Sequence, residues 1–99
     1  MTLHRSSLPQ AQFQILLALA DGAKPGHQIN EDMASRSEGR LAMGPGTLYG
    51  GLKRLLRRGW VVEEEGRYRI TRTGAEAIDR ELSRMKEIMG IATEKGLVL

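Results

Sequence analysis

The sequence contains no cysteine, and its aromatic residues amount to one tryptophan, two tyrosines and one phenylalanine. The absence of cysteine excludes disulfide bonds, thiolate metal sites and thiol nucleophiles. With so few aromatic rings, the interior must consist mainly of leucine, isoleucine, valine and methionine. Ninety-nine residues are enough for one domain with a modest core, which a partner chain would help to stabilise.

Long hydrophobic runs are missing as well. No uninterrupted apolar run approaches the roughly 20 residues needed to cross a membrane, and the N-terminus lacks the apolar core of a signal peptide. We therefore expect a cytoplasmic protein with no membrane partner.

Acidic residues are absent from one segment, although the chain has 12 of them against 15 basic residues and a net charge of +3. Between positions 40 and 58 the only charged residues are basic: Arg40, Lys53, Arg54, Arg57 and Arg58. Positive charge concentrated on one element is typical of a nucleic-acid-binding surface. The plain alternative is a solvated helix face.

Residues 45–58 are predicted to form a helix, because Pro45 suits a first turn and Gly59 suits a helix end. The leucines at 48, 52, 55 and 56 share one side. The opposite side carries Gly46, Thr47, Gly50, Lys53, Arg54 and Arg57. We interpret this as a recognition helix whose small residues approach base edges and whose later basic residues meet phosphates.

Two shorter helices are predicted before it, at about residues 9–20 and 27–36, with a turn at 23–26 between them. The first has an unusually wide apolar arc, with one face of Phe13, Leu16, Leu17 and Ala20 and a second face of Ile15 and Leu19. The second face indicates either deep burial or a dimer interface. Leu41 and Met43 alternate in a way that favours a short edge strand.

A β-hairpin is predicted next, with strands at residues 60–64 and 67–71 joined by a two-residue turn of Glu65 and Gly66. We expect Val62, Tyr68 and Ile70 on its packed face and Trp60 at the end of the core. The acidic residues at 63–65 would be repelled by phosphate, so we expect this wing to add less DNA affinity than is usual.

The last helix is predicted to begin at residue 72 with Thr71 as its N-cap. Its apolar residues are spaced three and four apart: Ala75, Ile78, Leu82, Met85, Met89 and Ala92. This seven-residue repeat indicates a coiled-coil seam about 25 Å long, and favours dimerisation over packing within the chain. The fold class is therefore mainly α with a small β-hairpin: a winged helix-turn-helix domain at 8–71 and a C-terminal dimerisation helix at 72–95.

Four motifs in this order resemble the PadR family of bacterial transcriptional regulators, in a short form with a single C-terminal helix. They are PGTLY at 45–49, LKRL at 52–55, RGWV at 58–61 and YRIT at 68–71, the last followed by Gly74. The resemblance covers about residues 8–93. It implies a homodimeric repressor whose third helices enter successive major grooves of a pseudo-palindromic operator.

The resemblance also implies roles for single residues. Thr47 and Tyr49 would contact DNA near the helix start, although Tyr49 lies on the border between the two faces and packing is the alternative. Arg67 and Arg69 would carry the wing toward the minor groove. Some relatives bind flat hydrophobic effectors between the dimer helices, where Met85 and Met89 would lie; ordinary seam packing is the alternative.

These interpretations define two residue sets and one leading function, a sequence-specific DNA-binding regulator. The DNA-binding set is Arg40, Gly46, Thr47, Tyr49, Gly50, Lys53, Arg54, Arg57, Arg67 and Arg69. The dimer-interface set is Ile15, Leu19, Ala75, Ile78, Leu82, Met85, Met89 and Ala92. The alternative function is a winged-helix module that docks an acidic protein partner on the basic helix.

Catalytic constellations are scarce. The two histidines stand alone, no pair of carboxylates lies in an apolar setting, and residues 44–46 lack the Lys-Ser/Thr sequence of a phosphate loop. We expect no enzymatic activity, no cofactor and no metal ion.

Overall fold

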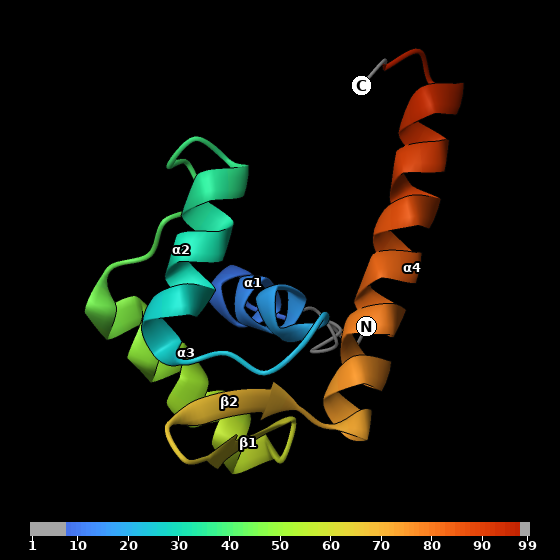
Figure 1. Cartoon of the computed structure of the whole chain (residues 1–99). Helices are drawn as coiled ribbons and strands as arrows, with labels where there is room; N and C mark the ends of the chain where they lie inside the picture. The colour runs from blue at the N-terminus through green and yellow to red at the C-terminus, as the bar shows by residue number, and fades with distance from the viewer. Residues whose placement is uncertain (1–7, 98–99) are drawn as a thin grey trace.

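The structure is a computed structural model that describes residues 8–97. It contains α1 (Gln10–Leu19), α2 (Gly26–Arg36), α3 (Pro45–Arg58), β1 (Val61–Glu64), β2 (Arg67–Ile70) and α4 (Arg72–Glu94). Figure 1 shows α1, α2, α3 and the hairpin gathered into one body, with α4 standing beside it as a long rod. The predicted fold class, mainly helical with a two-stranded hairpin, is confirmed.

The hydrophobic core lies around α1, which is packed between α3, α2, the hairpin and the first turns of α4. Its largest fully buried side chains come from four elements: Ile15, Leu16, Leu19, Ile29, Leu52, Leu55 and Val61. Burying one such aliphatic side chain contributes about 1.5–3 kcal/mol. The three N-terminal helices and β1 therefore form one cooperative body.

Of the two alternatives for the Ile15 and Leu19 face of α1, deep burial is the one found. Ile15 and Leu19 are only 0% and 1% exposed and belong to the core of their own chain, so their assignment to a dimer interface is wrong. Leu17 is 40% exposed instead. Because α1 is the central helix, α3 packs directly on its Ile15 side and leaves the Leu17 side open.

The hairpin pairs Val61 with Ile70 and Glu64 with Arg67, so Glu65 and Gly66 form the predicted two-residue turn. Both turn residues have positive φ, 53° and 79°, as a mirror-image turn requires. Tyr68 and Ile70 pack against the core as predicted, and only the first strand differs from the prediction, by one residue. Val61, not Val62, is buried, because successive strand residues point to opposite faces and Val62 lies on the side of Arg69.

No strand forms at residues 41–43, contrary to prediction. The outer edge of β2 is paired instead by Lys24, whose N–H donates to the Tyr68 carbonyl (3.0 Å) and whose carbonyl accepts from the Tyr68 N–H (2.8 Å). Met43 bonds to a side chain of α2 instead of a neighbouring strand.

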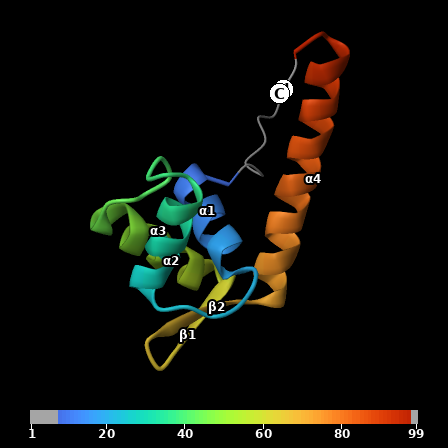
Figure 2. The same ribbon diagram turned by 45° about the horizontal axis from the view of Figure 1, so that its top comes forward.

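The N-terminal half of α4 belongs to the core and its C-terminal half does not. Thr71 is the predicted N-cap, since its Oγ1 accepts from the Gly74 N–H at 3.1 Å and donates to the Gly59 carbonyl at 2.8 Å. Ile78 is 6% exposed in the core of its own chain, so its place in the dimer-interface set is wrong. Beyond Glu81 the helix leaves the body, and Figure 2 shows that part rising away from α2.

None of the helices found among residues 8–97 has the length and apolar character needed to cross a membrane.

Candidate nucleic-acid interface

The two sides of α3 differ as the sequence predicts. Leu48, Leu52 and Leu55 are buried, with at most 3% of their surface exposed. The other side is open to solvent or half-buried, and it carries Gly46, Thr47, Gly50, Lys53, Arg54 and Arg57. Within residues 8–97, none of the three basic side chains among them lies in an ion pair. Their charge is available to an external anion.

The N-terminus of α3 has no side-chain capping hydrogen bond among the described residues. Gly44 is the N-cap in an extended conformation, and it offers no hydroxyl or carboxylate to the first N–H groups. Pro45 follows at the first helical position. A Cβ built at Gly44 or at Gly46 would meet no atom within 4 Å among the described residues. The first turn is therefore accessible from outside.

The two central glycines of α3 have different environments. A Cβ built at Gly51 would lie 2.7 Å from Ile15 Cδ1, because α3 and α1 approach closely there. A Cβ at Gly50 would meet only Arg54 Nη1, at 3.9 Å. Gly51 is thus part of the core contact, whereas Gly50 lies on the open side of the helix.

Tyr49 is 49% exposed and lies across the start of α2. Its ring is so close to Gly26 that a Cβ at that position would lie 2.6 Å from Tyr49 Oη. Tyr49 therefore packs on α2 with one side and remains accessible on the other, which matches its predicted position at the border.

The remaining predicted DNA-binding residues already have partners. Arg40 Nη1 pairs with Glu38 Oε1 at 3.2 Å, and both side chains are exposed. On the wing, Arg67 Nη2 donates to the Ala23 carbonyl at 2.7 Å, and Arg69 Nη2 pairs with Glu64 Oε1 at 3.1 Å. Exposed pairs of this kind are weak and can exchange partners.

Arg67 and Tyr68 together join the hairpin to the loop before α2. Tyr68 is half-buried under this loop, and its burial, reinforced by the negative charge of Glu63, raises the pKa of its phenol. The wing is therefore held against the body by Arg67 and by the pairing of Lys24 with Tyr68.

Sequence reasoning missed a side-chain clamp on the turn between α2 and α3. Asn30 Nδ2 donates to the Met43 carbonyl at 2.7 Å, and Asn30 Oδ1 accepts from the Met43 N–H at 2.8 Å. Ser37 Oγ accepts from the Leu41 N–H at 2.8 Å. The two partners of the Asn30 clamp are 13 residues apart, so no local pattern in the sequence indicates it.

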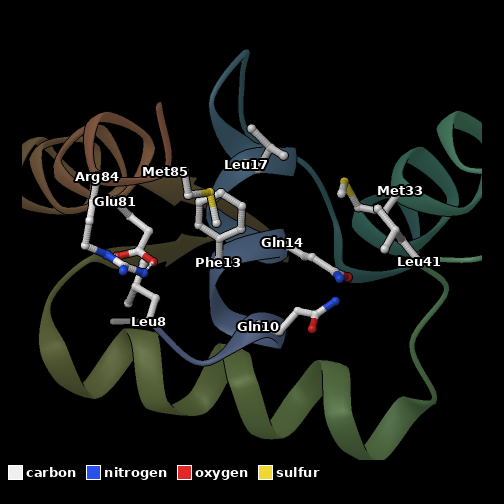
Figure 3. Close-up of a pocket in the computed structure, with 10 residues that line it drawn as sticks. All are labelled: Leu8, Gln10, Phe13, Gln14, Leu17, Met33, Leu41, Glu81, Arg84 and Met85. Carbon is white, nitrogen blue, oxygen red and sulfur yellow. Dashed lines mark hydrogen bonds and ion pairs between the residues drawn. The ribbon is translucent and has the colours of Figure 1, made fainter. Parts of the chain in front are cut away.

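A second candidate surface is an apolar groove of about 400 Å³ over α1, between α2 and α4. In Figure 3, Phe13, Leu17 and Gln14 of α1 lie between Met85 on one side and Met33 and Leu41 on the other. Ten residues line it: Leu8, Gln10, Phe13, Gln14, Leu17, Met33, Leu41, Glu81, Arg84 and Met85. Glu81, although only 5% exposed, pairs with Arg84 at 2.7 Å, which raises the pKa of Arg84.

The distal half of α4, which includes Met85 of the groove, carries a group of exposed apolar side chains that we call the α4 stripe. It consists of Leu82, Met85, Ile88, Met89 and Ile91. Ala92 is half-buried nearby, and Ala75 is exposed near the start of the helix. Leu82, Met85 and Met89 belong to the predicted seven-residue repeat. Ile88 and Ile91 lie outside it and widen the apolar surface around the helix, since at about 100° per residue Ile91 lies on the side opposite Leu82.

Comparison with known families decides what this arrangement belongs to. The family model described as "Transcriptional regulator PadR-like family" matches residues 15–80, about two thirds of the chain. The chain belongs to the PadR-like family. The family model describes transcriptional regulators, and the predicted resemblance to the PadR family is confirmed.

Solved structures share the PadR-like fold at low identity. A transcriptional regulator from Clostridium thermocellum has a TM-score of 0.74 and 22% identity, over 88% of this chain and 90% of that one. A PadR family transcription regulator from Clostridium difficile has a TM-score of 0.70 and 18% identity, over 87% and 97%. RosR of H. salinarum has a TM-score of 0.68 and 22% identity, over 90% and 94%.

A curated relative of this PadR-like chain is an uncharacterized 37.1 kDa protein in transposon TN4556 of Streptomyces fradiae. It is 40% identical over 92 residues, which cover 88% of this chain and 26% of the relative. The chain thus spans about a quarter of the length of that protein.

In residues 8–97, no group of three or more histidine or acidic side chains is placed to hold a metal ion.

Proposed function

We propose that this chain is a homodimeric, sequence-specific repressor that inserts α3 into the major groove of DNA. One observation carries the proposal. The leucine side of α3 is buried in the core, and its opposite side is open to solvent and carries basic but no acidic residues. A helix of this kind fits the major groove, where the small residues at its start reach base edges. Lys53, Arg54 and Arg57 would then bind phosphates and supply most of the affinity.

The α4 stripe supports the homodimer. Its five large apolar residues are 36–49% exposed, and several large apolar side chains exposed on one half of a helix are typical of an interaction site. We propose that the α4 helices of two copies cover each other's stripes, with the groove beside α1 continuing the same interface. Residues 8–71 would then read DNA and residues 72–95 would pair the copies.

Repression and location belong to the same proposal. A dimer that covers two half-sites within a promoter would occlude that promoter, and a DNA target supports a cytoplasmic location. Met85 belongs both to the groove and to the stripe. A flat hydrophobic effector that entered there would therefore disturb the pairing of the copies.

The test is selection from a random duplex library with the purified chain, followed by measurement of the mass of the complex in solution. We expect an inverted repeat bound by two chains, with half-site centres about 34–36 Å apart. The binding constant of the dimer should fall with salt at a logarithmic slope of about −5 if about six phosphates are neutralised. A shallow slope without sequence preference would favour the acidic protein partner instead.

A further inference from the structure

The start of α3 is fixed in place by a side chain of α2. Asn30 bonds both the N–H and the carbonyl of Met43, at 2.8 and 2.7 Å, and Met43 immediately precedes the N-cap Gly44. This is the pair of bonds that a neighbouring strand would make to Met43. The carboxamide therefore substitutes for the missing strand at the point where the chain enters α3.

Leu41 and Met43 pack against the core, but few other hydrogen bonds hold this point in the described structure. The backbone hydrogen bonds of residues 38–42 stay local, running from Gly39 to Ala34, from Arg40 to Ser37 and from Ala42 to Gly39. Gly44 provides no side-chain cap. Ser37 Oγ fixes Leu41, two residues further from the helix. The Asn30 clamp is thus the hydrogen-bonded link nearest to the first turn of α3.

We propose that Asn30 is a positioning residue for base readout, an inference that rests on the proposed function of α3. By holding Met43, it sets the direction in which α3 starts and so the placement of Gly46 and Thr47 against base edges. Hydrogen bonds to base edges weaken steeply when distance or angle changes. Lys53 and Arg54 contact phosphates through long flexible side chains and tolerate a small tilt. Loss of the clamp therefore reduces discrimination between sequences more than it reduces affinity for DNA in general.

The test compares the parent with Asn30→Ala on two duplexes: the best site selected by the parent and a scrambled duplex of the same composition, at one salt concentration. The Asn30→Ala variant should lower the ratio of the two affinities about tenfold, as the loss of one good base contact does. Its affinity for the scrambled duplex should stay within about twofold, because phosphate contacts carry that binding.

Two further variants separate positioning from stability. Ser37→Ala breaks the bond to Leu41 in the same turn and should lower the melting temperature while it preserves the affinity ratio. Asn30→Asp keeps an oxygen for the Met43 N–H and loses the donor to the Met43 carbonyl. It should also lower the ratio, because its second carboxylate oxygen would face the Met43 carbonyl oxygen, and it serves as the decisive variant if Asn30→Ala does not fold.

The outcomes are distinct. A parent ratio near one would overturn the proposed function, and this inference with it. A high parent ratio that neither Asn30 variant lowers would overturn this inference alone. The same holds if Ser37→Ala lowers the ratio as much as Asn30→Ala does, because the clamp would then be merely structural.

Discussion

At the scale of single residues, the adjacent glycines Gly50 and Gly51 of α3 have different roles. Gly51 lets α3 approach Ile15 of α1, whereas Gly50 has open space on the side we assign to DNA. Glycine in a helix interior costs about 1 kcal/mol relative to alanine. At Gly51 this cost is offset by close packing, and at Gly50 the structure of the chain alone offers no compensation.

Gly50→Ala is therefore expected to stabilise the free protein by about 1 kcal/mol, because it removes a flexible helix position without a clash. The same methyl group stands on the DNA-facing side and should weaken binding to the selected site. Chemical denaturation and DNA titration measure the two effects. A variant that binds the site as tightly as the parent would remove Gly50 from the interface.

Thr47→Ala and Lys53→Ala form a pair that separates base readout from phosphate contact. Thr47→Ala should change which sequences are preferred, since Thr47 is exposed in the first turn of α3. Lys53→Ala should weaken binding to all DNA sequences alike and reduce the logarithmic salt slope of the binding constant by about 1. Binding of each variant to a panel of single-base variants of the site measures both. If Thr47→Ala keeps the parental preferences, Thr47 does not read bases.

At the scale of elements, much of the fold could be predicted from local chemistry. Thr71 as an N-cap, Gly59 at the end of α3 and the Glu65-Gly66 turn each follow from one residue's conformational preference. Long-range partners could not be predicted. The Asn30 clamp and the pairing of Lys24 with Tyr68 join residues 13 and 44 positions apart, and they replaced the expected strand at 41–43.

The same limit explains the errors in burial. An apolar arc on α1 shows that the helix is buried on several sides, but its sequence alone does not tell which side meets its own chain. The apolar spacing therefore predicts Ile15 and Ile78 at an interface, whereas both lie in the core. In the candidate site, the helical spacing of the leucines predicts which side of α3 is open. It does not predict how the first turn of α3 is anchored.

Two glycines of α4 give a prediction at this scale. A Cβ at Gly74 would overlap the backbone carbonyl of Trp60, whereas a Cβ at Gly90 would meet nothing within 4 Å in the described chain. Gly74→Ala should cost about 3 kcal/mol, because backbone cannot yield as a side chain can. Gly90→Ala should stabilise the helix by about 1 kcal/mol. Urea denaturation measures both, and a neutral Gly74→Ala would contradict the close docking of α4.

At the scale of the whole molecule, α4 connects two surfaces. Its first turns are packed in the core of the body, and its distal half carries the α4 stripe away from it (Figure 1). A rod fixed at one end and apolar at the other would hold two bodies at a set separation. In the proposed dimer, that separation would allow two copies of α3 to lie on one DNA duplex.

Ile88→Glu should therefore dissociate the proposed dimer without unfolding the chain, since it places a charge in the apolar stripe and outside the core. Ser83→Glu is the matched control, because Ser83 is exposed on α4 and is not part of the stripe. Sedimentation measures mass and circular dichroism measures helix content. A dimer that persists in Ile88→Glu would show that the α4 stripe is not the interface.

The spacing of the half-sites tests the central claim most directly. The affinity of the purified chain is measured for the selected inverted repeat and for the same repeat with five base pairs, half a helical turn, inserted between its halves. If α4 holds two α3 helices on one face of the duplex, the insertion reduces affinity to that of an isolated half-site. Equal affinity for the two duplexes would contradict the account.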